Sequence, residues 1–201
     1  MTAFDLSRGL PVGSMGRRAN GWWGMITLIA TEGALFVYLL FSYFYIAVQH
    51  GREWLPPDLP SLSLSIPNTV ILLVSGVAVW RGESLLIAGR RGPIVAIHIL
   101  AALVLGLAFI SLEGWEWSME KLTPASGSFG SLYFMLGALH LAHLVIGALI
   151  LAALALWSAL GYFDARRSAP VSIGALYWYF VIVVWLAVFF TLYITPRLSL
   201  G

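Results

Sequence analysis

Three titratable side chains stand near the middle of long apolar stretches of the sequence: Glu32, His140 and His143. The two histidines are three positions apart, so a helix would place both imidazoles on one face. Glu32 stands about ten residues into its own apolar stretch, roughly 15 Å along a helix axis and at a depth similar to that of the histidines. This placement predicts that Glu32 can contact one of the two imidazoles.

The chemistry of Glu32 has two interpretations on the residues alone. A carboxylate at the centre of a bilayer costs roughly 2.5–3.5 kcal/mol on insertion scales, so such a group normally faces a bundle interior, a cavity or a partner subunit. There it could serve a proton-linked or gas pathway. It could equally be a hydrogen-bonded contact that holds helices together.

The histidines are candidate ligands of a metal ion or a b-type haem, but the ligand set is small. Zinc usually takes four ligands, and the other candidates in apolar stretches are Glu32 and His98. His98 stands only about five residues from the start of its stretch, too shallow to share a haem with His140. The chain has no cysteine, which excludes thiolate ligands and cysteine nucleophiles. We therefore expect hydrogen bonds between helices or to a neighbouring subunit, and we expect His50 to be an interface residue.

A short acidic cluster is formed by Glu113, Glu116 and Glu120, with Trp115 and Trp117 between them. Paired carboxyl groups on one helical face could act as an acid–base pair. More often, such a run is the solvated end of a membrane helix within a belt of tryptophans. We expect the solvated end.

The composition indicates which class of protein carries these residues. Of the 201 residues, 60% are hydrophobic and 10% are charged, whereas soluble domains carry about 25% charged residues. The formal net charge of +2 is too small for a phosphate-binding surface, so no nucleic-acid partner is expected. These values exclude a soluble enzyme and a disordered tail, and they predict an integral membrane protein.

Five stretches are long enough to cross a bilayer as helices, which takes about 20 residues, whereas a barrel strand needs only about 9–11. We predict an all-α bundle of five transmembrane helices within a domain at 22–201, preceded by a cytoplasmic segment at 1–21. No removable signal peptide is expected. The predicted spans are roughly 22–48, 67–88, 93–112, 128–160 and 171–195.

The distribution of Lys and Arg predicts the orientation, because these residues are enriched on the cytoplasmic side. One side would hold Arg8, Arg17, Arg18, Arg81, Arg90, Arg91, Arg166 and Arg167, and the other Arg52, Lys121 and Arg197. We therefore expect a cytoplasmic N-terminus and an outer C-terminus.

Five motifs occur in the order known from one family of membrane proteins. They are WGMITLIATEGALF at 23–36, NTVILLVSG at 68–76, LEGWEW at 112–117, LHLAHL at 139–144 and YWYFVIVVW at 177–185. The chain thereby resembles subunit III of haem–copper terminal oxidases, the cytochrome c oxidase subunit III family, in a five-helix bacterial form.

The sequence also departs from the pattern of this family. Tyr179 stands where members often carry histidine, Ile182 where they often carry aspartate, and Glu113 where glutamine is usual. The first two helices of the seven-helix mitochondrial type, which help to form a lipid-holding cleft, have no counterpart here. These departures suggest a divergent branch of the family.

The resemblance implies a non-catalytic subunit of a proton-pumping oxidase in the aerobic respiratory chain, located in the bacterial cell membrane. It implies no catalytic, cofactor-binding or metal site in this chain, and places haem and copper in partner subunits. Subunit I would pack directly against it, subunit II would belong to the same complex, and a phospholipid is a candidate ligand. Its role would be to stabilise subunit I and to support proton uptake and oxygen access. The polar positions singled out are Glu32, Asn68, Glu116, His140, His143, Trp178 and Trp185.

Two alternatives stay open. The chain could be an accessory subunit of a quinol oxidase or a nitric oxide reductase of the same superfamily. It could also be an independent proton-linked channel or carrier that uses Glu32 and the histidine pair as a relay.

Overall fold

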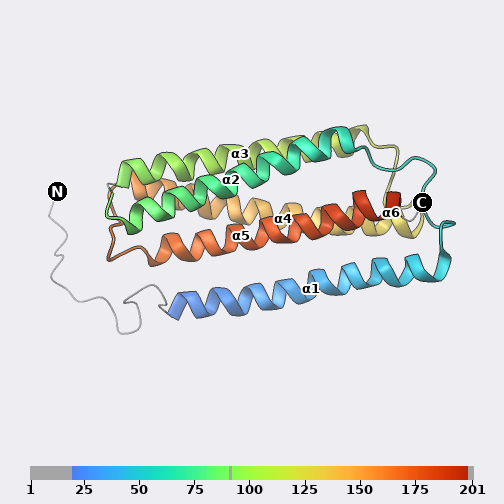
Figure 1. The fold of residues 1–201 in the computed structure, drawn as a ribbon, viewed down its shortest axis with the longest axis horizontal. Helices are drawn as coiled ribbons and strands as arrows, with labels where there is room; N and C mark the ends of the chain where they lie inside the picture. The colour runs from blue at the N-terminus through green and yellow to red at the C-terminus, as the bar shows by residue number, and fades with distance from the viewer. Residues whose placement is uncertain (1–19, 91, 199–201) are drawn as a thin grey trace.

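The structure, a computed structural model, describes residues 20–90 and 92–198. Five long helices dominate this part of the chain (Figure 1). They are α1 (Asn20–His50), α2 (Leu62–Ile87), α3 (Gly92–Met119), α4 (Gly127–Ala159) and α5 (Ala169–Phe189). A π-helical segment, η1 (Phe190–Ile194), leads from α5 into the short helix α6 (Thr195–Leu198).

The all-α prediction with five spans is confirmed. Within the described ranges there is no strand, and five helices are long and apolar enough to cross a membrane, the last running from Ala169 to Leu198. The helix α1 already begins at Asn20. The rest of the segment predicted at 1–21 lies outside the described residues.

Two helix boundaries differ from the predicted ones. The helix α2 begins at Leu62, before the predicted start at Pro67, because the Ser61 side chain accepts a hydrogen bond from the backbone N–H of Ser63 at 3.2 Å and caps the helix. Pro67 fits in the second turn, where its missing N–H removes one backbone bond. The helix α3 runs on past residue 112 to Met119, so Glu113 and Glu116 lie within it.

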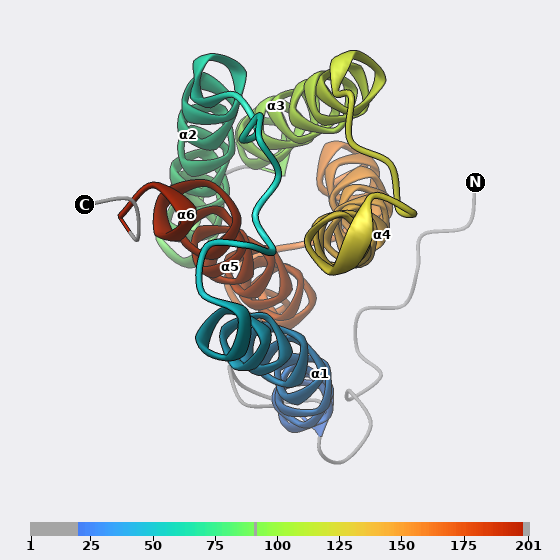
Figure 2. The ribbon, with the colours of Figure 1, turned by 90° about the vertical axis from the view of Figure 1, so that its right-hand side faces the viewer.

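The helices are not equally enclosed. Figure 2, which views the bundle end-on, shows α2, α3, α4 and α5 grouped together and α1 beside α5. Among the described elements, the helix α1 packs mainly on α5 and α4. In its most apolar window 6% of the residues are buried, compared with 33% to 50% in the other four spans.

The core of the four grouped helices is built around Trp178 of α5, which is fully buried. Its indole fits between glycines of α3 and α4. A Cβ added at Gly106 would lie 2.7 Å from the ring, and one at Gly147 would lie 2.8 Å from it. Small residues thus allow the helices to approach closely around a large aromatic side chain.

Candidate functional site

Glu32 of α1 meets His143 of α4, which confirms the contact predicted from their depth. His143 Nε2 and Glu32 Oε2 are 3.3 Å apart, and His143 Nδ1 lies 2.7 Å from the carbonyl oxygen of Leu139. Because a carbonyl oxygen can only accept, Nδ1 carries a hydrogen, and Nε2 is the nitrogen that shares a proton with the carboxyl group. The Glu32 side chain remains 35% exposed, so this pair reaches the surface of the bundle.

His140 lies in a different environment although it stands on the same helix. Its ring stacks on Trp185 of α5, with ring centres 5.0 Å apart, and meets the edge of Phe109 of α3. Both ring nitrogens are buried and have no hydrogen-bond partner among the described residues. The two histidines therefore serve different contacts, His143 toward α1 and His140 toward the aromatic core.

The histidines do not converge with other ligands. His98 is bonded to the carbonyl oxygen of Ile94 in its own helix, and His50 is exposed at the end of α1. In the part of the chain that the structure describes, no three His, Cys, Asp or Glu side chains are placed to hold a metal ion.

The interpretation of the acidic cluster as a solvated helix end is wrong for two of its members. Glu113 and Glu116 are each only 2% exposed, because α3 continues past them and α2 covers them. Asn68 Nδ2 of α2 lies 3.2 Å from Glu113 Oε2, and Ser65 Oγ lies 2.8 Å from Glu116 Oε1. Glu120, just beyond α3, is half-buried.

Glu116 also ends a chain of hydroxyl groups that the sequence did not indicate. Tyr193 of η1 donates to Glu116 Oε1 at 3.0 Å, and the Tyr133 hydroxyl of α4 lies 3.1 Å from that of Tyr193. Because the Tyr193 hydroxyl has one hydrogen and donates it to Glu116, Tyr133 is the donor to Tyr193. Two lone tyrosines 60 residues apart give no signal in the linear sequence.

The two tryptophans singled out in α5 both fasten this helix to α2. Trp178 Nε1 donates to Ser75 Oγ at 3.0 Å, and Trp185 Nε1 donates to Thr69 Oγ1 at 2.9 Å. Both bonds are buried. Without them, each indole N–H would be unpaired in an apolar interior, which costs free energy. Each of the seven polar positions selected from the sequence thus contacts another helix.

A bundle of apolar helices joined by buried polar contacts defines a multi-pass membrane protein, and comparison with known proteins narrows the class. The sequence model of the family "Cytochrome c oxidase subunit III" matches residues 17–196. The chain is 32% identical over 178 residues to cytochrome c oxidase subunit 3 of Neurospora crassa, covering 85% of this chain and 65% of that protein. It is 31% identical over 178 residues to that of Marchantia polymorpha, covering 85% of this chain and 67% of that protein. It is 31% identical over 179 residues to that of Danio rerio, with coverages of 85% and 68%.

The chain belongs to the cytochrome c oxidase subunit III family, as the resemblance in its motifs implied. It spans about two thirds of the length of the curated relatives that it matches. Its five described spans fit a five-helix form of this family.

Proposed function

We propose that this chain is the non-catalytic subunit III of a proton-pumping haem–copper terminal oxidase in an aerobic respiratory chain. In this role it stabilises subunit I by direct helix packing, belongs to a complex that also contains subunit II, and supports proton uptake and oxygen access. Haem and copper belong to the partner subunits, and a phospholipid is a candidate ligand of this chain. The proposed location is the bacterial cell membrane, with the start of α1 on the cytoplasmic side and α6 on the outer side.

The observation that carries this proposal is that buried polar side chains form hydrogen bonds between helices. Asn68, Glu116, Trp178 and Trp185 each hydrogen-bond across to another helix of the bundle. Such contacts stabilise a helical bundle in lipid, where apolar burial between helices contributes little. A subunit whose role is structural requires a rigid bundle of this kind, and the match to subunit III supports that role.

A second observation concerns the surface that the bundle offers to a partner. One side of α1 carries large apolar side chains that are more than half exposed: Val37, Tyr38, Phe41, Tyr45 and Val48. Glu32 lies on the opposite side of this helix, toward His143. The apolar side of α1 can lie against lipid or against helices of a larger subunit.

The test is to purify the tagged chain from native membranes in mild detergent, record a visible spectrum and identify the co-purified chains by mass spectrometry. We expect haem absorbance and a large haem-bearing subunit in near-equal amount to the tagged chain. A colourless preparation without such a subunit would refute the proposal. The haem type in the spectrum also helps to separate a cytochrome c oxidase from the quinol-oxidising and nitric-oxide-reducing alternatives.

The channel hypothesis is tested on the same chain. We expect liposomes that hold the chain alone to show no proton flux that depends on Glu32. A flux that disappears in Glu32→Gln would favour an independent proton-linked channel instead.

A further inference from the structure

We propose that the pocket at the α6 end of the bundle binds a hard divalent cation, Ca²⁺ or Mg²⁺, which keeps most of its water and is held by the carboxyl groups of Glu116 and Glu120. This proposal does not depend on the proposed function. It rests on the pocket, on the hydrogen bonding of Glu116 and on the charges that line the pocket.

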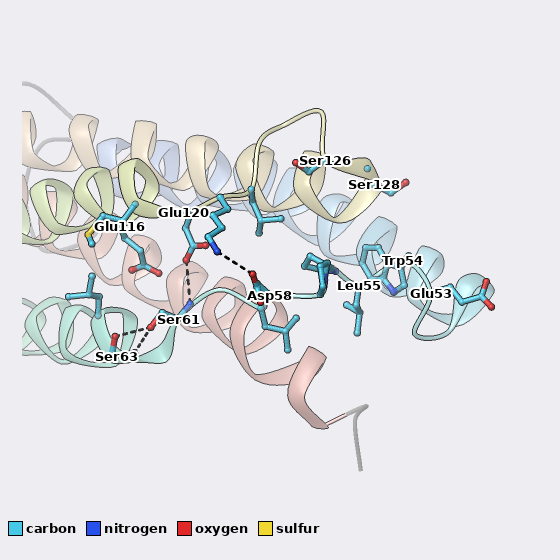
Figure 3. Close-up of a pocket in the computed structure, with 18 residues that line it drawn as sticks. Glu53, Trp54, Leu55, Asp58, Ser61, Ser63, Glu116, Glu120, Ser126 and Ser128 are labelled. Carbon is cyan, nitrogen blue, oxygen red and sulfur yellow. Dashed lines mark hydrogen bonds and ion pairs between the residues drawn. The ribbon is translucent and has the colours of Figure 1, made fainter.

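The pocket lies where the connection from α1 to α2 meets the end of α3 and the start of α4 (Figure 3). Its volume is about 960 Å³. A cation with six waters occupies on the order of 200 Å³, at about 30 Å³ per water. The pocket therefore has room for a hydrated ion, and among the residues that line it the Glu120 carboxyl group meets the backbone N–H of Ser61 (Figure 3).

Glu116 is hydrogen-bonded on one side only. Its Oε1 accepts from Tyr193 at 3.0 Å and lies 2.8 Å from Ser65 Oγ, whose single hydrogen is shared with the Ser61 carbonyl oxygen at 2.6 Å. Its Oε2 is buried and has no hydrogen-bond partner in the described part of the chain, and Glu116 lines the pocket. These contacts hold the carboxyl group in place through Oε1 and leave Oε2 without a donor among the described residues. A buried carboxylate oxygen with no donor is costly unless a cation or water satisfies it.

The charges around the pocket favour a cation. Of the described residues that line it, four carry carboxyl groups (Glu53, Asp58, Glu116 and Glu120) and Lys121 alone carries a cationic group. Lys121 lies 3.7 Å from Asp58, and both side chains are more than four-fifths exposed, so this lysine pairs with an exposed carboxylate and not with the buried Glu116. Glu120, which is half-buried, accepts a bond from the backbone N–H of Ser61 at 3.4 Å through one of its two oxygens.

The chemistry of the donors decides which cation fits. Carboxylates and serine hydroxyls are hard oxygen donors, which suit Ca²⁺ and Mg²⁺. The described residues offer no group of three or more acidic or imidazole ligands, so an ion enclosed entirely by protein would lack ligands. Mg²⁺ in particular usually keeps several waters and binds through one or two carboxylates. A hydrated divalent ion therefore matches the pair Glu116 and Glu120.

The experiment measures equilibrium binding of radioactive Ca²⁺ to the full chain, purified in non-ionic detergent with the chains that co-purify with it. We expect saturable binding in the wild type that Mg²⁺ displaces. In Glu116→Gln and in Glu120→Gln this binding should weaken roughly tenfold or more, since carboxylate count sets the affinity of such sites. The matched control is Glu83→Gln, in α2 near the opposite end of the bundle, which should bind as the wild type does.

Three outcomes would overturn the proposal. They are the absence of saturable binding, equal affinity in all three variants and the wild type, and displacement by ethylammonium or methylguanidinium but not by Mg²⁺. The last result would assign the pocket to a basic side chain of a neighbouring protein. Glu120→Gln keeps the test decisive if Glu116→Gln does not fold, because Glu120 is half-buried and lies outside α3.

Discussion

The helices α5 and α1 are held to the rest of the bundle in contrasting ways. Two buried indole N–H groups fasten α5 to α2, and Trp178 lies wedged between glycines of α3 and α4. The helix α1 buries only Phe36 and Tyr43 among its described residues. Its polar contact with another helix is the pair of Glu32 and His143, which is partly open to the surroundings.

This contrast shows how stability is distributed in the chain. Between helices in lipid, close packing and hydrogen bonds supply most of the attraction, and both are concentrated in α2 to α5. We infer that α2 to α5 form the stable unit and that α1 is attached more weakly. Substitutions in the two regions should therefore differ in their cost.

The largest effect is expected for Trp178→Ala. Removing a fully buried tryptophan leaves a cavity between four helices and takes away the indole donor to Ser75, so the free energy of unfolding should fall by about 3–5 kcal/mol. The measurement is unfolding in mixed micelles with increasing sodium dodecyl sulfate. The control is Trp115→Ala, at a side chain that is 59% exposed, with an expected change of about 0.5 kcal/mol or less. Equal losses would contradict the central role of Trp178.

The next effect tests the close packing at Gly106. An added methyl group would meet the Trp178 ring at 2.7 Å, so Gly106→Ala should lower the free energy of unfolding by about 1–3 kcal/mol. Gly114→Ala in the same helix is the matched control, because a Cβ there meets no described atom within 4 Å. If both variants unfold alike, the glycine at 106 is not required for packing.

A smaller effect is expected for Trp185→Phe, which keeps a ring against His140 but removes the N–H that bonds Thr69. Leaving the buried Thr69 hydroxyl without this donor should cost about 1–2 kcal/mol in the same unfolding assay. The double variant with Thr69→Val removes both partners and should recover part of the loss. A double variant that is as unstable as the sum of the single variants would argue against this hydrogen bond.

The smallest effects are expected in α1. Glu32→Ala should lower the free energy of unfolding by about 0.5–1 kcal/mol, because the pair with His143 is partly exposed. Glu32→Gln keeps a hydrogen-bonding side chain of the same shape and should change it less. A loss in Glu32→Ala as large as that in Trp178→Ala would show that α1 is part of the stable unit after all.

The sequence predicted those features that follow from local patterns. The spans follow from apolar length, and the contact of Glu32 with a histidine follows from similar depth in two helices. The choice of Asn68, Trp178 and Trp185 as polar positions follows from the family motifs, whereas the helices that they contact were not predicted. In each case the prediction needs only the position of a residue within its own helical segment, and no knowledge of how the helices pack.

The rest depended on partners that are distant in the chain. Glu116 is buried because Ser65 and Tyr193 meet it, 51 and 77 residues away. No local pattern indicates these pairings. In addition, Glu113 and Glu116 lower the hydropathy of the sequence just after residue 112, so the predicted span ended there although α3 continues to Met119. The isolated ring of His140 was also not predicted, because it depends on the packing of Trp185 and Phe109.

The π-helical segment η1 determines the direction in which the side chains of α6 point around the helix axis. A π-helical turn inserts one residue relative to an α-helix, and each residue advances a helix by about 100°. Arg197, beyond η1, donates hydrogen bonds to the carbonyl oxygens of Tyr193 and of Pro60, in the connection between α1 and α2. Deleting one residue from η1 would rotate Arg197 around the helix axis and away from Pro60. The extra residue thus orients Arg197 so that it connects α6 to the loop between α1 and α2.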